Sequence, residues 1–442
     1  MGGRGAGAVV IALTMLVVLV VLVVGMASSC AASGAGDRVD GVIETDDAGA
    51  MQMNSSDPRT LPVLLNGQDV LSIINEQQST LVEQANSYEE LESALSELQQ
   101  LNEDQSREIV LLEQDICRLE IPKFDWIQGT GAGENKWTGG VLAANGLIYG
   151  VPHSATNVLI IDPKTNTLDT TTITGLPADE YKWSGGVLAP NSNVIYCFPF
   201  NADSVLKIDP STSTADWTTI TGVGSSEQKF FSGAMGSNGL IYGIPFSATF
   251  VLIVDPNTDT IDTTTLNGLG NDLAKWWGGV AVPDGRIFGI PYNADGVLVI
   301  DPDTNTVDTT SIAGLSSPGG REWVGGVLAN NSLIYGIPRY SEAVLIIDPE
   351  SMTADTTSIQ GVDGVDKWIG GVLTANGRVV GIPYGSDTVL IVDPATNTAD
   401  TTSLAGVGGA NYKYRGGVLG PNNLVYAIPF FASSVLVVDV GC

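Results

Sequence analysis

Lysines followed directly by aromatic residues recur through the chain, and this pairing carries the clearest binding chemistry. The pairs stand at intervals of 45 to 47 residues, with Glu322 in place of the lysine at one position. A ring of ammonium groups and aromatic faces suits an anionic sugar or a protein segment. Alternatively, the aromatic residues pack between repeats and the lysines pair with acidic neighbours. The positions are Lys136, Trp137, Lys182, Trp183, Lys229, Phe230, Lys275, Trp276, Trp323, Lys367, Trp368, Lys413 and Tyr414.

A second set of candidate binding residues follows a proline that recurs in each repeat. Its members are more varied than the lysine-aromatic pairs, and positions that differ between repeats are expected to tune specificity. The set comprises His153, Phe200, Phe246, Tyr292, Arg339, Tyr384 and Phe430, and further variable positions are Tyr340, Asp203, Asp295, Glu342 and Asp387.

Catalytic motifs are scarce in this sequence. His153 is the single histidine, which argues against most imidazole-based catalysis and most multi-histidine metal sites. No nucleophile accompanies a base, and no glycine-rich phosphate loop is present. We therefore expect a binding protein without catalytic residues. A carbohydrate-active hydrolase or lyase that uses Asp203 or Asp295 with a neighbouring carboxylate is the alternative.

The net charge and the acidic turns bear on whether the protein could bind nucleic acid or calcium. The formal net charge of −30 argues against nucleic acid, because a face that neutralises phosphates needs many cations. In the turn DPDTNTVD, Asp301, Asp303, Asn305 and Asp308 place oxygens at alternating positions, as calcium loops do. In other repeats Lys164 occupies the slot of Asp303 and Met352 occupies that of Asn305, so a hairpin turn is favoured. The sequence predicts no cofactor and no metal site.

The cysteines allow one structural hypothesis. Cys442 ends the last repeat, and Cys117 precedes the segment expected to pair beside it. In an oxidising compartment the two sulfurs are candidates for a disulfide. The alternative is that Cys117 is free or bridges two chains. Cys197 replaces a glycine of the repeat and is expected to be a buried thiol.

Seven repeats position these residues. The aspartate that precedes the proline of the DP turn serves as an anchor, and its spacing is 45 to 47 residues. Each repeat contains four β-rich segments, such as GGVLA, IYGIP, VLIID and DTTTI, separated by turn residues. Four short strands in a repeat of this length predict an all-β fold, the seven-bladed β-propeller. The anchors are Asp162, Asp209, Asp255, Asp301, Asp348, Asp393 and Asp439.

The ends of the repeat region predict how the ring closes. The last repeat lacks its fourth segment, whereas the residues before the first repeat resemble one. We therefore expect residues 123–129 to supply the outer strand of the seventh blade. The paired glycines that follow the aromatic positions fit innermost strands, where the blades converge.

The segment IYGIPYNADGVLVIDPDTNTVDTTSIAG resembles a kelch repeat in its strand order, and its second half is similar to YVTN-type repeats of cell-surface propellers. The resemblance covers residues 121–442 and implies a propeller fold. It implies no particular function, because propellers of both kinds have diverse functions.

The residues before the repeats suggest where the protein resides. Residues 8–27 form an apolar run long enough to span a bilayer, and acidic residues follow it. Residues 1–36 are thus expected to be a transmembrane signal-anchor, with the N-terminus cytoplasmic and the propeller extracellular or luminal. A cleaved signal peptide and secretion is the alternative, and a lipid on Cys30 is a third possibility.

A helical segment lies between the apolar run and the repeats. Residues 37–67 read as a flexible linker, and residues 68–120 contain a seven-residue apolar repeat. Its a positions run from Ile74 to Ile116, which predicts a coiled-coil stalk helix and a homo-oligomer through residues 74–119. One long helix that lies on its own protein is the alternative.

Overall fold

The computed structural model describes residues 41–45, 51–55, 64–65, 68–119, 122–315 and 320–441, and side chains from residue 72 to 109, 122 to 315 and 320 to 441. The chain divides into two compact units, with the boundary between Leu111 and Leu112. The apolar run of residues 8–27 and Cys442 lie outside the described residues, as does the side chain of Cys117. No described helix is long and apolar enough to cross a membrane.

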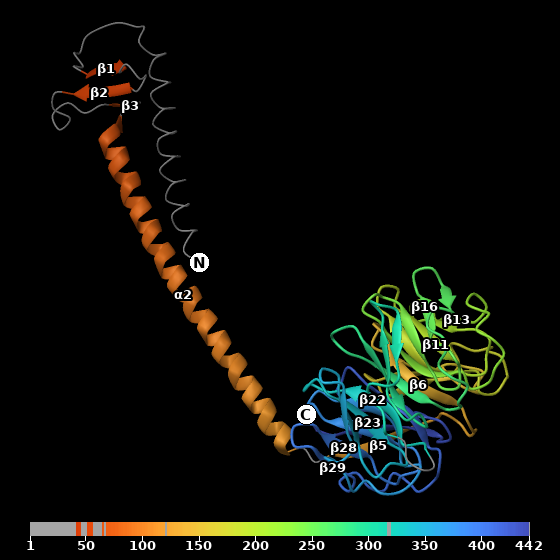
Figure 1. The fold of residues 1–442 in the computed structure, drawn as a ribbon. Coiled ribbons are helices and arrows are strands. Elements are labelled where there is room, and N and C mark those ends of the chain that lie inside the picture. The colour runs from red at the N-terminus through yellow and green to blue at the C-terminus, as the bar shows by residue number, and fades with distance from the viewer. Residues whose placement is uncertain are drawn as a thin grey trace. The chain divides into compact units, whose positions relative to one another are not determined.

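The first unit contains two strand pairs and most of one long helix. Strand β1 (Gly41–Thr45) pairs with β2 (Met51–Ser55), and β3 (Leu64–Leu65) pairs with β4 (Gln68–Asp69). Helix α2 (Val70–Leu119) is a single continuous helix of 50 residues (Figure 1). Its apolar heptad positions are exposed, for example Leu91 at 65% and Leu98 at 62%. No described residue of this unit covers these side chains.

The second unit is a seven-bladed β-propeller built from seven four-stranded antiparallel sheets. The fold predicted from the repeats is therefore confirmed. The innermost strands are β6 (Trp137–Leu142), β10 (Trp183–Ala189), β14 (Phe230–Met235), β18 (Trp276–Ala281), β22 (Trp323–Leu328), β26 (Trp368–Leu373) and β30 (Tyr414–Leu419). The second strands are β7 (Ile148–Pro152), β11 (Val194–Pro199), β15 (Ile241–Pro245), β19 (Ile287–Pro291), β23 (Ile334–Pro338), β27 (Val379–Pro383) and β31 (Val425–Pro429).

The outer half of each blade is shorter. The third strands are β8 (Leu159–Asp162), β12 (Leu206–Asp209), β16 (Leu252–Asp255), β20 (Leu298–Asp301), β24 (Leu345–Asp348), β28 (Leu390–Asp393) and β32 (Ser434–Asp439). The outer strands are β9 (Thr167–Asp169), β13 (Thr214–Asp216), β17 (Thr260–Asp262), β21 (Thr306–Asp308), β25 (Thr353–Asp355), β29 (Thr398–Asp400) and β5 (Lys123–Gln128).

Strand β5 closes the ring although it comes from the opposite end of the repeats. It pairs with β32 in antiparallel register from Ser434 opposite Gln128 to Asp439 opposite Lys123. This is the pairing that the sequence leads us to expect for residues 123–129. Ile127 packs against the apolar cluster between the seventh and first blades.

The core lies between neighbouring blades. The aromatic residue that begins an innermost strand packs into the apolar cluster of the preceding blade, as Trp183 does against Val141 and Val151. The indole nitrogen of Trp183 donates to the backbone oxygen of Ser204 at 2.7 Å, so the polar edge of the ring is satisfied. Each blade is therefore held by its neighbour as well as by its own strands.

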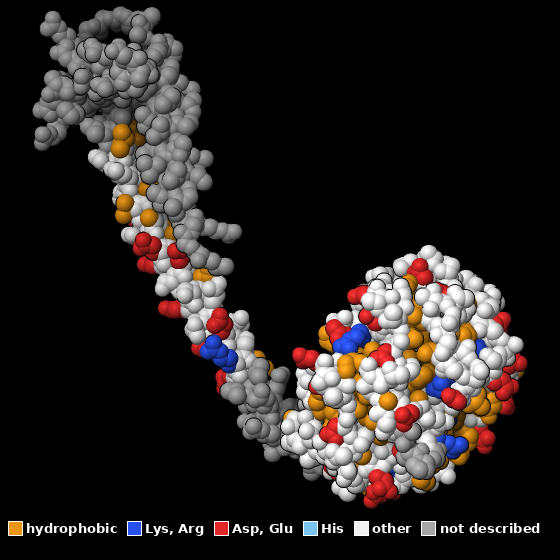
Figure 2. Space-filling model, viewed as in Figure 1, with side chains coloured by type: hydrophobic (Ala, Val, Ile, Leu, Met, Phe, Trp, Pro, Cys, Tyr) orange, Lys and Arg blue, Asp and Glu red, His pale blue; other side chains and the backbone are white. Residues whose placement is uncertain are grey.

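The surface of the propeller is acidic. Asp and Glu side chains are scattered over the visible face, whereas Lys and Arg side chains are few and separate (Figure 2). The lysines of the repeats contribute little to this surface because most of them are buried.

A candidate ligand-binding cavity at the centre of the propeller

A bulge interrupts each innermost strand close to the axis. In β6 the pairing with β7 shifts between Trp137 and Gly140, and Gly139 has a φ of +73°. A Cβ on Gly139 would lie 3.1 Å from the Cα of Gly185 in the next blade, so the strands approach closely only with glycine there. Ser232 takes this place in the third blade. Bulges re-aim neighbouring side chains, and here the neighbour is the residue before the glycine pair.

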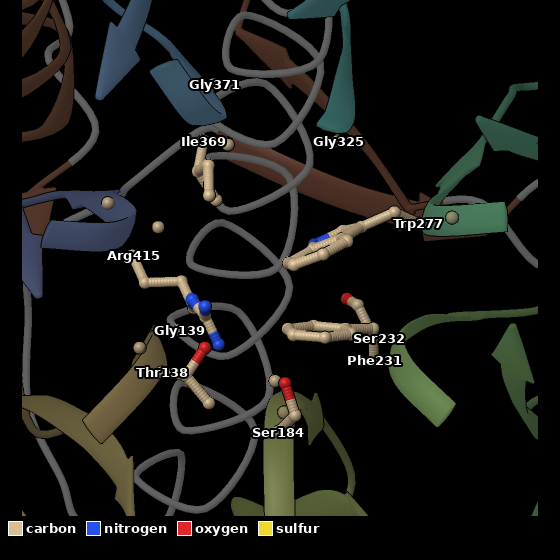
Figure 3. Close-up of a pocket in the computed structure, with 18 of the residues that line it drawn as sticks. Thr138, Gly139, Ser184, Phe231, Ser232, Trp277, Gly325, Ile369, Gly371 and Arg415 are labelled. Carbon is tan, nitrogen blue, oxygen red and sulfur yellow. The ribbon is translucent and has the colours of Figure 1, made fainter. Parts of the chain in front are cut away.

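Seven equivalent positions thus fall around the axis, and their residues differ from blade to blade. All except Val324 line a cavity of about 180 Å³ whose remaining walls are mostly glycine backbone (Figure 3). The seven residues are Thr138, Ser184, Phe231, Trp277, Val324, Ile369 and Arg415.

One wall of the cavity is aromatic. Trp277 stacks on Phe231 with ring centroids 3.5 Å apart and an interplanar angle of 25°. Both side chains are buried, and Ile369 adds a further apolar surface. In Figure 3 the two rings project from adjacent strands toward Arg415. This wall suits an apolar or planar ligand group.

Arg415 supplies the cation among the cavity-lining residues. Its Nη2 donates to the hydroxyl of Tyr384 at 3.0 Å, and its guanidinium carbon lies 3.7 Å from the ring centroid of Phe430. Its Nε is buried without a hydrogen-bond partner among the described residues. Burial lowers the pKa of Arg415, but a guanidinium keeps its charge in proteins. No ion pair joins it to a described carboxylate.

Two hydroxyl side chains, on the first and second blades, also line the cavity. Ser184 Oγ is buried and, like Arg415 Nε, has no hydrogen-bond partner among the described residues. Thr138 is also buried and lines the same cavity. Buried polar atoms are rarely left unpaired, because each costs about 1–3 kcal/mol. The cavity therefore presents unsatisfied polar groups opposite an aromatic wall.

The residues after the repeat proline are buried beside the axis. Their aromatic members form one apolar cluster with Phe231, Trp277, Val324 and Ile369. They are thus placed next to the cavity without forming an exposed ring. The sequence-predicted set is His153, Phe200, Phe246, Tyr292, Arg339, Tyr384 and Phe430, all of them buried.

His153 is held neutral in this cluster. Its Nδ1 lies 2.7 Å from the backbone oxygen of Trp183, so Nδ1 carries the proton and donates. Burial, reinforced by the charge of Arg415, lowers the pKa of His153 to about 3. A histidine with so low a pKa is a weak base at neutral pH.

Arg339 already has an anionic partner. Its Nε donates to Asp366 Oδ1 at 2.7 Å, and its Nη2 lies 2.5 Å from the same oxygen. Tyr340 donates to the other carboxylate oxygen of Asp366 at 3.1 Å. Arg339 and Arg415 each lie 5.4 Å from the ring of Tyr384, so the two arginines are close but only Arg339 is neutralised.

The lysines that precede the aromatic positions are buried and bonded to backbone oxygens. Lys229 is fully buried, and its Nζ donates to Ser226 at 2.6 Å and to Asn201 of the preceding blade at 3.3 Å. Burial lowers the pKa of Lys229 to about 8. Lys136, Lys182, Lys275, Lys367 and Lys413 are likewise buried and donate to backbone oxygens.

The aromatic partners of these lysines are also buried. The group comprises Trp137, Trp183, Phe230, Trp276, Trp323, Trp368 and Tyr414. The expectation of an exposed cationic and aromatic face does not match this geometry. The burial of the aromatic residues agrees with packing between repeats, but the ammonium groups bond to backbone carbonyls rather than to the acidic neighbours that this alternative expects.

The carboxylates that the sequence suggests for catalysis bind backbone amides of loops. Asp203 Oδ1 accepts from the backbone nitrogen of Gly224 at 2.5 Å, and Asp295 Oδ2 accepts from that of Gly314 at 3.1 Å. Neither residue lines the central cavity, and no carboxylate is among its lining residues. The aspartates of the DP turns likewise accept from their own turn, as Asp301 does from the amide of Asp303 at 2.9 Å. No described group of His, Cys, Asp and Glu side chains could hold a metal ion.

The seven positions around the axis are not among the binding residues that the sequence predicts. A signal is present, because in each repeat a variable residue stands between an aromatic residue and a glycine pair, with Ser232 in place of the first glycine in the third repeat. The residues after the repeat proline vary as well, and the sequence pattern points to them first. The bulge that turns the variable side chain toward the axis cannot be predicted from the alternation of apolar and polar residues along the strand.

Comparisons with known proteins show the fold. No family model matches the chain, and no curated protein matches it. A streptogramin B lyase structure is 10% identical with a TM-score of 0.56, covering 72% of this chain and 98% of that one. Virginiamycin B lyase from Staphylococcus aureus is 11% identical with a TM-score of 0.57, covering 72% and 99%. The extracellular domain of a protein described as a one component system from B. thetaiotaomicron is 12% identical with a TM-score of 0.53, covering 72% and 40%.

Proposed function

We propose that the chain is a recognition module whose propeller binds a small ligand in the central cavity. The observation that carries this proposal is the difference between blades at the seven axial positions. The strand cores repeat the same residue types from blade to blade, yet at the axial positions the repeats place two hydroxyl residues, four apolar residues and one arginine. Seven different neighbours around one point form an asymmetric site, which a symmetric scaffold does not need for its stability.

A binding function fits the cavity better than a hydrolase or a lyase. The two carboxylates of a glycosidase face the scissile bond together, whereas Asp203 and Asp295 bond to loop amides outside the cavity. His153 donates from Nδ1 to a carbonyl and has a pKa of about 3, so it lacks the basicity of a general base. The lyases of similar fold are about 10% identical and bring no activity to this chain.

We also propose that this module is displayed outside a membrane. Residues 8–27 would anchor the chain and α2 would act as a stalk. An extracellular domain among the similar structures is compatible with this location.

The proposed site is tested by a ligand screen on the full-length protein. Small metabolites and glycans are screened by calorimetry against the wild type, Trp277→Leu and Trp126→Leu. Trp126 is 38% exposed on β5 and serves as a control for the loss of one tryptophan. A ligand that binds the wild type and Trp126→Leu but not Trp277→Leu supports the central site. Equal binding to all three proteins would place the site elsewhere.

A further inference from the structure

The central cavity contains a buried cation, and none of its described lining residues is a carboxylate. Arg415 bonds to Tyr384 and stacks on Phe430, but its Nε has no partner among the described residues. A buried charge is costly unless it is paired. The nearby carboxylate of Asp366 is already paired with Arg339, whose Nε and Nη2 both contact its Oδ1, so it does not neutralise Arg415.

A second polar atom in the same cavity has no hydrogen-bond partner among the residues that the structure describes. This atom is the buried Oγ of Ser184, and a hydroxyl can donate to an anion. A Cβ on Gly140 would lie 2.7 Å from the Cδ1 of Ile428 in the seventh blade, so the close packing of these blades beside the cavity requires glycine at this position. Unfilled bonding capacity on two side chains around one cavity points to a ligand that accepts hydrogen bonds.

We propose that the cavity binds a small monocarboxylate, whose carboxylate is held by Arg415 and Ser184 and whose apolar body lies against Trp277 and Phe231. This inference rests on the proposed function and specifies its ligand. Guanidinium groups bind carboxylates through charge-assisted hydrogen bonds. The stacked rings, together with Ile369, form the apolar half of the cavity.

The size and charge of the cavity select among anions. About 180 Å³ is below the roughly 300 Å³ at which pockets for drug-sized ligands begin. A doubly charged phosphate would bring a second negative charge and more acceptor oxygens than the lining donors satisfy, and some would face the aromatic wall. A short carboxylic acid with two to four carbons beyond the carboxylate matches both the polar and the apolar part of the cavity.

The experiment uses calorimetry on the full-length protein with acetate, propionate, butyrate, propionamide and inorganic phosphate. We expect saturable binding that strengthens from acetate to butyrate and is weaker or undetectable for propionamide and phosphate. Arg415→Met should weaken butyrate binding about 10- to 150-fold, because a hydrogen bond to a charged group is lost. Ser184→Ala should weaken it several-fold, and circular dichroism verifies that both variants fold.

Arg286→Met is the matched control, since Arg286 pairs with Asp284 away from the cavity and should bind butyrate as the wild type does. Equal butyrate affinity in Arg415→Met and the wild type, or no saturable binding of any carboxylate, would overturn the inference. Propionamide binding that is lost in Trp277→Leu but kept in Arg415→Met would overturn the carboxylate assignment while leaving the proposed cavity site in place.

Discussion

Buried lysines act as connectors between blades rather than as ligand-binding cations. Lys229 illustrates the arrangement, because its Nζ bonds to a carbonyl of its own loop and to one of the preceding blade. Lys136, Lys275, Lys367 and Lys413 repeat it, as Lys413 does with Ser386 and Ala410. A cation that satisfies several otherwise unpaired carbonyls stabilises the junction, and its loss leaves those oxygens buried.

Replacing Lys229 with methionine should therefore destabilise the propeller by about 1–3 kcal/mol, the cost of buried acceptors without donors. Urea unfolding followed by circular dichroism measures the change. Lys164→Met is the control, because Lys164 is exposed on a turn and donates no side-chain bond to another blade. Equal unfolding free energies for the two variants would show that the buried ammonium group does not hold the blades.

The burial of these lysines was hard to predict from the sequence. A lysine before a tryptophan reads equally well as a solvent-exposed cation or as a connector, because local pattern does not show which carbonyls a later repeat brings nearby. The axial residues were missed for a related reason. Thr138 and Arg415 belong to one spatial ring only after seven bulged strands meet.

The strands, in contrast, were predictable in number and order. In each repeat, apolar residues alternate along the strand segments and turn residues separate these segments. The local sequence therefore favours the same four strands that packing in the propeller requires. The closing strand β5 could also be assigned, since the last repeat lacks its fourth segment and the residues before the first repeat resemble one. In the structure Phe124 packs between the sixth and seventh blades, and Ile127 packs between the seventh and first. Bulges in the innermost strands were not predictable, because paired glycines fit both a regular strand and a bulge.

Because β5 closes the ring, a carboxylate introduced on its packed side should destabilise the propeller, whereas one at an exposed position should not. Ile127→Asp should lower the unfolding free energy by about 2 kcal/mol or more, because a carboxylate would enter an apolar junction. Gln128→Asp should have little effect, since Gln128 is exposed. Thermal unfolding by calorimetry measures both, and an unchanged melting temperature in Ile127→Asp would contradict the packing of β5 in the ring.

The aspartates that end the outer strands should make the stability of the propeller sensitive to low pH. Side-chain bonds from Thr172, Ser311 and Ser358, with backbone amides, lower the pKa values of Asp169, Asp308 and Asp355 to about 2. An unfolded aspartate titrates near 3.9. Their folded pKa values are depressed, so this stabilisation is present above about pH 4 and is lost as the pH falls toward 2.

Urea unfolding at pH 5, 3 and 2 tests this dependence in the wild type, Asp355→Asn and Asp303→Asn. We expect the loss of stability between pH 5 and 2 to be smaller in Asp355→Asn, whereas Asp303→Asn on an exposed turn should follow the wild type. Identical pH dependence in all three proteins would show that these turns do not couple protonation to folding.

Helix α2 carries apolar side chains that no described residue of its own unit covers. Leu91, Leu95 and Leu98 are each more than half exposed, at the heptad positions where two helices meet. We propose a second copy of the chain as their partner. Acidic residues beside the seam, such as Glu108, oppose a very tight association.

Sedimentation equilibrium of the full-length protein tests this assembly. Leu95→Asp should shift the protein to monomer, since the charge would enter the seam. Ser93→Asp lies on the opposite heptad position and should leave the oligomer intact. A monomeric wild type would refute the coiled-coil stalk, and an oligomer that persists in Leu95→Asp would place the interface elsewhere.

The proposed function requires a ligand at the propeller axis. The most direct measurement is a crystal structure of the full-length protein soaked with 3-bromopropionate, with the bromine located by its anomalous scattering. We expect a bromine peak within the cavity, near Trp277 and Phe231, with the carboxylate on Arg415. A structure with an empty cavity, or with bromine bound only outside it, would contradict ligand binding at the axis.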